Sequence, residues 1–119
     1  MKKAWVVLLV LLFASPLYCV GALAEDYAET SGEQTATGVI YNGECFLVAI
    51  EVITDGTNDA KLIVYDALST DGKVVFEMTV TGSSHYGGRL FIPSVHMQTG
   101  IYGVLSGTGA SYIVEYKRR

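Results

Sequence analysis

The sequence has few basic residues and few cysteines, and each shortage argues against a class of protein. Eight Lys and Arg stand against twelve Asp and Glu, which gives a formal net charge of −4. A nucleic-acid-binding domain needs the opposite balance, so we expect no nucleic-acid partner. The two cysteines, Cys19 and Cys45, fall on either side of a predicted cleavage site described below. An internal disulfide is therefore excluded in the mature chain.

The sequence also lacks a catalytic or cofactor-binding motif. Ser84 follows Gly82 as in a nucleophile elbow, but Tyr86 stands where the second glycine is needed. Residues 107–112 lack the third glycine of a dinucleotide-binding loop and lead into a predicted strand. We therefore predict a protein that is not an enzyme and that binds no cofactor.

Metal and carboxylate sites are equally poorly supported. His85 and His96 are the only histidines and have no further ligand at a spacing typical of zinc sites. A glycosidase would need two carboxylates facing one cleft, and the sequence indicates no pairing among the candidates Glu44, Glu51, Asp66 and Glu77.

What the sequence does contain is an N-terminal export signal. Lys2 and Lys3 precede an apolar run over residues 4–14, and residues 20–24 follow with a small-x-small pattern that ends at Ala24. This order is typical of a secretory signal peptide, and we predict cleavage after Ala24. The alternative is a retained helix that anchors the chain, and a membrane association is expected only in that case. The protein is thus predicted to be secreted or exposed at the cell surface.

The rest of the chain is divided by composition into two parts. Residues 25–38 are acidic and almost free of large apolar side chains, which predicts a flexible arm. Residues 39–119 form the predicted β-domain. Residues 25–119 carry six Lys or Arg against twelve Asp or Glu and are long enough for one domain.

Short apolar and β-branched runs follow the arm, and Gly, Asn, Asp or Ser ends each run. This pattern is typical of strands joined by tight turns. We predict an all-β fold, a single antiparallel β-sandwich of jelly-roll-like type with about seven strands, although barrel closure would give the same alternation. The predicted strands are residues 39–41, 45–54, 61–68, 74–81, 89–94, 101–105 and 112–117.

Alternation within the runs predicts their environment. In residues 74–81, Val74, Phe76, Met78 and Val80 fall on one face and are expected in the core. Residues 61–68 are apolar on both faces, which favours a central strand. Pro93 removes a ladder donor, so its strand is expected at an edge or with a bulge.

Three turn dipeptides, Asn42-Gly43, Asp55-Gly56 and Asp71-Gly72, favour hairpins and an antiparallel meander. Asp55, Thr57 and Asp59 also have the alternate spacing of calcium ligands. The twelve-residue calcium-loop pattern also requires Gly at position 60 and Glu at position 66, but this sequence has Ala60 and Asp66. We therefore interpret the segment as a turn.

Tyrosines are the remaining feature, because they are amphipathic and common at protein interfaces. Core tyrosines of a sandwich are the alternative. Cys45 lies in an apolar run and is interpreted as a buried small hydrophobe, with intermolecular pairing as the alternative. The predicted interface candidates are Tyr41, Tyr65, Tyr86, Tyr102, Tyr112, Tyr116 and Cys45.

Residues 42–116 resemble small β-sandwich structural proteins of tailed bacteriophages. The resemblance lies in Asp55 to Ala60 leading into Leu62 to Asp66, a Gly-rich loop before Leu90 to Pro93, then Gly100 to Tyr102 and Ser106 to Ala110. It implies a non-enzymatic virion component that packs into a repeating assembly. Phage head and tail parts need no export signal, whereas this chain opens with one, so either a related domain serves an exported role or the N-terminal helix is an anchor.

Together these observations predict an exported structural or assembly protein that self-associates, or decorates a larger particle or filament, through strand edges and tyrosine-rich faces. The expected partner is a homo-oligomer or a larger protein assembly. The alternative is a secreted monomeric module that binds glycans or a receptor, through Tyr86 and its Gly-rich loop or the turn at 55–59.

Overall fold

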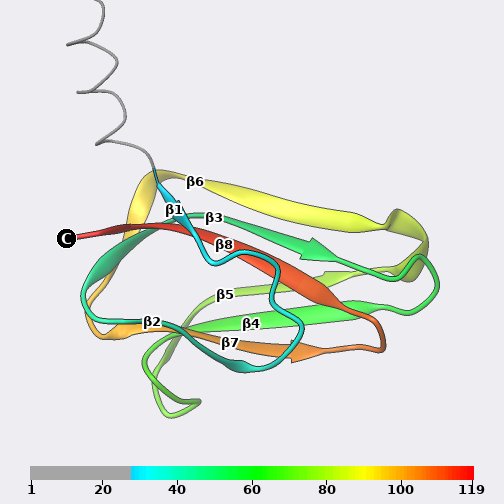
Figure 1. Cartoon of the computed structure of the whole chain (residues 1–119), viewed down its shortest axis with the longest axis horizontal. Helices are drawn as coiled ribbons and strands as arrows, with labels where there is room; N and C mark the ends of the chain where they lie inside the picture. The colour runs from blue at the N-terminus through cyan, green and yellow to red at the C-terminus, as the bar shows by residue number, and fades with distance from the viewer. Residues whose placement is uncertain (1–27) are drawn as a thin grey trace, which may run out of the picture.

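Residues 28–119 form two antiparallel β-sheets packed face to face, and these are the residues that the computed structural model describes (Figure 1). The predicted signal lies outside them. Sheet 1 has the order β1 (Glu29–Thr30), β8 (Ser111–Arg118), β3 (Cys45–Ile53), β6 (Tyr86–Met97). Sheet 2 has the order β2 (Gly38–Asn42), β7 (Gly100–Ser106), β4 (Ala60–Asp66), β5 (Lys73–Val80).

The connections pass between the sheets at every step except β4 to β5, so the expected meander is wrong. Asn42-Gly43 carries the chain from sheet 2 to sheet 1, and Asp55-Gly56 carries it back. Both glycines have positive φ, 138° and 89°. A positive-φ turn reverses the chain sharply without deciding which strand becomes the neighbour. Only Asp71-Gly72 lies in a hairpin connection.

The core lies between the sheets and comes from alternate residues of the strands. Leu62 and Val64 on β4 are fully buried, and so are Val52 on β3 and Val114 on β8. As predicted, β4 is central, between β7 and β5. The residues on its other face, including Ile63 and Tyr65, also lie in apolar surroundings described below.

One expectation about the core is corrected on β5. Phe76 and Val80 are buried as predicted, but Val74 is 46% exposed. The register shifts there, because Val64 pairs with Phe76 and the next residue, Tyr65, pairs with Val74. The extra residue on β5 turns Val74 to the outer face, as a β-bulge does.

The arm is also corrected, because residues 28–37 lie along β8 and β7 instead of standing free. β1 pairs with β8, and Gln34 exchanges backbone hydrogen bonds with Tyr112 at 2.8 and 2.9 Å. The Oγ1 of Thr37 accepts a hydrogen bond from the N–H of Leu105 at 3.0 Å. Composition predicted flexibility because the arm has little apolar surface, but backbone hydrogen bonds order it instead.

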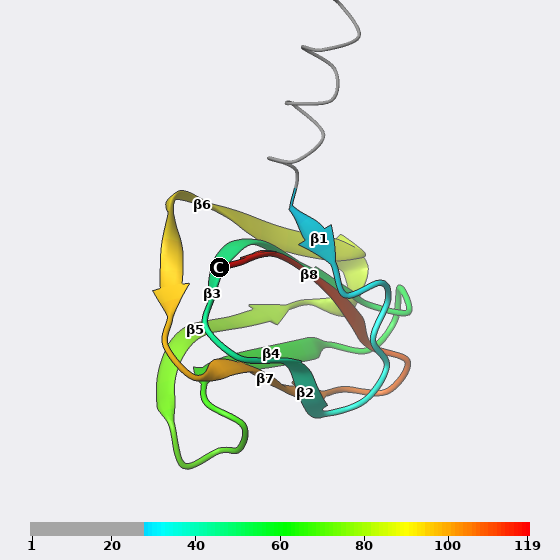
Figure 2. The ribbon, with the colours of Figure 1, turned by 60° about the vertical axis from the view of Figure 1, so that its left-hand side comes forward.

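Pro93 lies where the sequence predicted, in an edge strand with a register shift. Leu47 of β3 pairs with Val95 and Ala49 pairs with Leu90, so residues 91–94 bulge away from one residue of β3. Within this bulge the Phe91 ring turns inward and meets Phe76 of β5 at 5.8 Å between centroids. β6 thereby bends down the side of the two sheets (Figure 2).

Tyr112 is the largest fully buried side chain and spans the gap between the sheets. Its ring lies against Gly103 of β7, where an added Cβ would stand 2.5 Å from the hydroxyl. The hydroxyl donates a hydrogen bond to the carbonyl of Ala36 at 3.4 Å. Burial raises the pKa of Tyr112 to about 12. Glycine at 103 is therefore required by the tyrosine that packs on it.

We predict that Gly103→Ala destabilises the domain by about 1–3 kcal/mol, because the methyl group overpacks the Tyr112 site. Gly38→Ala is the matched control, since Gly38 pairs with Gly103 but has open space around its Cβ position. It should change stability by less than about 0.5 kcal/mol. Urea unfolding of residues 25–119 measures both. Equal effects of the two variants would contradict the assigned packing.

Candidate functional site

The outer face of sheet 2 carries an apolar surface that crosses all four strands. Val39, Tyr102, Tyr65 and Val74 are successive cross-strand partners on β2, β7, β4 and β5. Ile63 and Val104 form the adjacent pair and lie on the same face. We call these six residues the tyrosine face. Val39 is 49% exposed, and the two tyrosine rings meet edge to face at 6.4 Å.

The charges on this side of sheet 2 cancel. Lys61 and Glu77 lie beside the tyrosine face, and the Lys61 Nζ is 2.9 Å from a Glu77 oxygen. Both side chains are about half exposed, so the pair contributes little to stability. The pair nevertheless leaves the surface beside the tyrosine face locally neutral, although the chain as a whole is acidic.

The predicted interface tyrosines divide between this face, the core and one edge. Tyr65 and Tyr102 belong to the tyrosine face. Tyr112 and Tyr116 are buried, and Tyr41 packs on Tyr116 with 5.1 Å between ring centroids. Tyr112 and Tyr116 have no surface to offer a partner, and the partly buried Tyr41 ring is engaged with Tyr116, so we leave these three out of the proposed surfaces.

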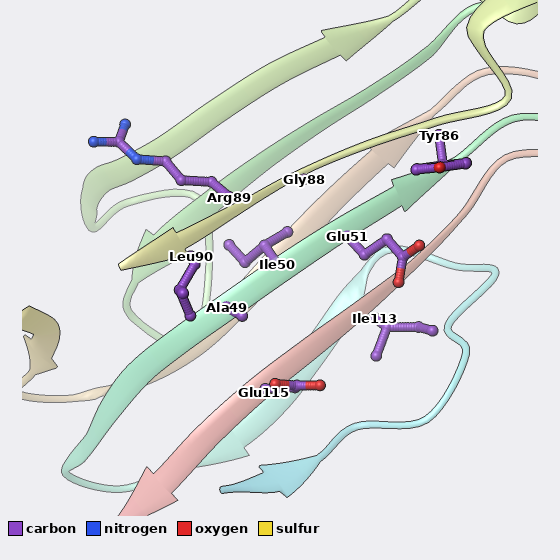
Figure 3. Close-up of a pocket in the computed structure, with 9 residues that line it drawn as sticks. All are labelled: Ala49, Ile50, Glu51, Tyr86, Gly88, Arg89, Leu90, Ile113 and Glu115. Carbon is purple, nitrogen blue, oxygen red and sulfur yellow. The ribbon is translucent and has the colours of Figure 1, made fainter. Parts of the chain in front are cut away.

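Tyr86 is 68% exposed and begins β6, the edge strand of sheet 1. Leu90 on the same strand is 61% exposed and Ile92 is 83% exposed. Gly88 lies between Tyr86 and Leu90, and the three residues line a hollow of about 270 Å³. Figure 3 shows Tyr86 and Leu90 along β6 with Gly88 between them, and Arg89 extending away from the hollow.

Two carboxylates from neighbouring strands lie at the other side of this hollow. Glu51 of β3 and Glu115 of β8 line it together with Ala49 and Ile113 (Figure 3). The register pairs Ala49 with Glu115 and Glu51 with Ile113, so the carboxylates are diagonal neighbours on one face. Of the candidate acids from the sequence, Glu51 is the one that the fold brings beside another carboxylate in this hollow, and Glu115 was not foreseen.

The other candidate acids are engaged elsewhere. Glu44 accepts hydrogen bonds from Arg119 and, at 2.6 Å, from His96. Both bonds lower the pKa of Glu44, and the bond from Arg119 has the larger effect. Asp66 accepts the backbone N–H groups of Gln98 and Thr99, both at 2.9 Å, in the turn that leads into β7. Burial raises its pKa, but these donors outweigh burial and the pKa is lowered overall.

The turn at residues 55–59 uses its carboxylates to hold the backbone. Asp55 accepts hydrogen bonds from the N–H groups of Thr57 and Asn58 at 2.9 and 2.7 Å. These bonds lower the pKa of Asp55, and the bond from Asn58 has the larger effect. Asp59 accepts the N–H of Gly82 at 2.9 Å from the neighbouring loop. The turn interpretation thus accounts for both acids.

The remaining polar candidates lie in that neighbouring loop and show no ligand geometry. Ser84 shares a hydrogen bond of 2.8 Å with the hydroxyl of Thr81, in a short 3-10 helix over Gly82–Ser84. His85 follows this helix with a φ of 64°. Among residues 28–119, no group of three or more His, Cys, Asp or Glu is placed to hold a metal ion.

Cys45 is fully buried at the start of β3, as the hydrophobic interpretation predicted. Burial, and then the charge of Asp66, raises the pKa of its thiol to about 11. Cys45 therefore has no accessible thiol in the folded subunit, and it too is left out of the proposed surfaces.

Sequence reasoning missed Val39, Val74, Leu90 and Ile92 as exposed residues. Val74 was hidden by the bulge on β5, which alternation cannot reveal. For Leu90 and Ile92 no signal was available, because Pro93 predicted an edge strand but not which of its side chains face the solvent. Val39 lies in a short strand, where the sequence gives no face.

The sequence matches no known protein-family model, and comparison with curated proteins and with solved structures found no match. In the part of the chain that the structure describes, no helix is long and apolar enough to span a membrane.

We predict that Asp66→Asn lowers the free energy of unfolding by about 1–3 kcal/mol at pH 7, because an amide cannot accept every bond that the carboxylate accepts. A lowered pKa in the fold means that Asp66 stabilises above its unfolded pKa and loses this effect as the pH falls through the folded pKa. Urea unfolding from pH 7 to pH 2 should therefore show a flatter acid limb in the variant. Asp71→Asn, at an exposed position, should keep the original limb.

We also predict that the thiol of Cys45 in residues 25–119 does not react with an aromatic disulfide reagent at pH 8 until the domain unfolds. Burial and the raised pKa both suppress the thiolate. Ser94→Cys supplies the control, since position 94 is exposed and its thiol should react at once. Rapid labelling of native Cys45 would contradict its place in the core.

Proposed function

We propose that this protein is an exported, non-enzymatic structural subunit that self-associates through the tyrosine face of sheet 2. The observation that carries the proposal is the row of Val39, Tyr102, Tyr65 and Val74 across the whole width of the sheet. Contiguous apolar surface of this kind marks association sites in soluble proteins, and tyrosine is enriched in interfaces.

Charge supports a second copy as the occupant. Residues 25–119 carry twelve acidic against six basic side chains, so two copies repel at most relative orientations. The tyrosine face is uncharged, and the Lys61–Glu77 pair beside it is neutral. Two copies that meet face to face therefore avoid the general repulsion. The outer face of sheet 1 carries Glu51 and Glu115 and offers no such relief.

Topology and the N-terminal sequence support the rest of the proposal. The strand orders 1-8-3-6 and 2-7-4-5 are those of an eight-stranded jelly roll, a fold that viral capsid and lectin domains use. We infer a jelly roll preceded by a cleaved signal peptide, and a role like that of the virion proteins that the sequence resembles. Fold analogy alone gives no function, so the tyrosine face is the main argument.

A second candidate function is a monomeric glycan-binding module. The hollow beside Tyr86 favours it, because an exposed aromatic ring can stack on a sugar and Glu51 and Glu115 can accept hydrogen bonds from hydroxyl groups. The hollow is shallow and its two carboxylates come from strands without loops that close over it. We rank this candidate second.

Static light scattering of residues 25–119 across a concentration series tests the proposal, and we expect a mass above that of the monomer. Val39→Lys together with Val74→Lys should weaken the association by about tenfold or more, because two half-buried valines contribute on the order of 2–3 kcal/mol and the new charges repel. Both positions are about half exposed, so the fold should persist.

Thr70→Lys together with Ser83→Lys is the matched control, with the same charge change at two exposed loop positions outside the tyrosine face. It should leave the mass unchanged. A chain that stays monomeric at all concentrations would refute self-association and make a glycan screen with Tyr86→Ala the next measurement. Equal loss in both double variants would show a general charge effect and would contradict the tyrosine face.

A further inference from the structure

We propose that β6 pairs antiparallel with β6 of a second copy, centred on Gly88, so that the two copies of sheet 1 join into one continuous sheet. This inference rests on the proposed self-association and names its second contact. The tyrosine face and the β6 edge belong to different sheets, so a subunit can use both.

The first argument is that the first part of β6 is an open edge. Residues 86–90 lie at the end of sheet 1, before Pro93 and the bulge that interrupt the strand, and they carry two of the most exposed apolar side chains, Tyr86 and Leu90. Apolar edges pair with other chains unless charges, prolines or bulges prevent it, and Arg89 is the single charged residue of this stretch. The other edges are shorter or more strongly interrupted. β1 has two residues, β2 has a register shift between Val39 and Tyr41, and β5 carries Lys73 and Glu77.

The second argument concerns register. In antiparallel pairing, directly opposed residues lie on the same face, so a twofold axis must pass through one residue position. Centring on Arg89 would oppose two guanidinium groups, which destabilises the pair. Centring on Gly87 would place Leu90 opposite Ser84, in the turn that precedes the strand. Pro93 and the bulge at residues 91–94 end the regular edge beyond Leu90.

Centring on Gly88 has neither defect. Tyr86 of each copy then stands opposite Leu90 of the other, and such aromatic and aliphatic cross-strand pairs are stabilising. Arg89 stands opposite Gly87, which has no side chain to oppose it. The two Gly88 residues meet at the axis without side chains that could clash, and Tyr86 of each copy lies beside the hollow that Gly88 lines. The edge is thus complementary to itself in this one register.

Disulfide trapping with single-cysteine variants tests the register. Tyr86→Cys and Leu90→Cys, in residues 25–119 carrying tags of different size, are mixed and mildly oxidised with copper phenanthroline. We expect the mixture to form a linked heterodimer at least about fivefold more than either variant alone. In this register, position 86 lies about 13 Å along the strand from position 86 of the second copy, too far for a disulfide.

Ser94→Cys mixed with Tyr86→Cys is the control, because position 94 is exposed on the same strand but lies outside the proposed pairing. It should link no more than the single variants. Cys45 is buried and should not contribute. If the Tyr86→Cys and Leu90→Cys mixture links only at the control level, the proposal is overturned. That result is also the one expected if β6 pairs with a strand of another protein.

Light scattering of the same samples under reducing conditions separates this inference from the proposed function. If the chain is an oligomer but the mixture does not link, the tyrosine face survives and the β6 pairing fails. If the chain is a monomer and nothing links, both fail. Leu90→Lys provides a variant without cysteine chemistry, and it should reduce the mass of the assembly, whereas Ser94→Lys should not.

Discussion

The packing of Tyr112 on Gly103 is the contact on which the rest of the structure depends. The ring is the largest fully buried side chain and fills the space that a residue without a side chain leaves on the facing sheet. Its backbone pairs with Gln34, and its hydroxyl reaches the carbonyl of Ala36. One residue thus joins sheet 1, sheet 2 and the N-terminal segment. Because the segment is held there, it enters β2 beside β7 and brings Val39 next to Tyr102.

Crossing between the sheets has a consequence for the surfaces. Strands distant in sequence become neighbours, so the tyrosine face collects residues from positions 39 to 104 of the chain. The inner faces of the sheets use the buried residues of each strand for the core. The outer faces are then left with different compositions, since sheet 1 presents Glu51 and Glu115 while sheet 2 presents Tyr65 and Tyr102. This asymmetry, more than the fold, distinguishes the side of the subunit that we propose as a contact.

The sequence predicted the two-sheet fold and most strand positions because alternation of apolar residues is a local property. It predicted the central place of β4 for the same reason, and the edge or bulge at Pro93 because proline has no backbone N–H to donate. It could not predict the pairing order, because the turns at Gly43 and Gly56 reverse the chain without choosing a neighbour. Nor could it separate Tyr65 from Tyr112, since both alternate with apolar residues and differ only in what the opposite sheet places against them. The exposure of Val74 was not predicted because it depends on a bulge. The order of the arm was not predicted because it depends on backbone hydrogen bonds, which composition does not encode.

The two proposed contacts together constrain the symmetry of an assembly. A face-to-face contact of two copies of sheet 2 has its twofold axis in the plane between them, whereas antiparallel pairing of β6 has its axis perpendicular to sheet 1. Because the sheets are stacked, these axes run at a large angle to each other. Two twofold contacts on one subunit generate a closed assembly where the axes intersect at an angle that divides a half-turn evenly, with a tetramer for a right angle, and an open series where the axes do not intersect. The mass of the assembly therefore separates the two geometries, since a closed assembly reaches a plateau with concentration and an open series keeps growing.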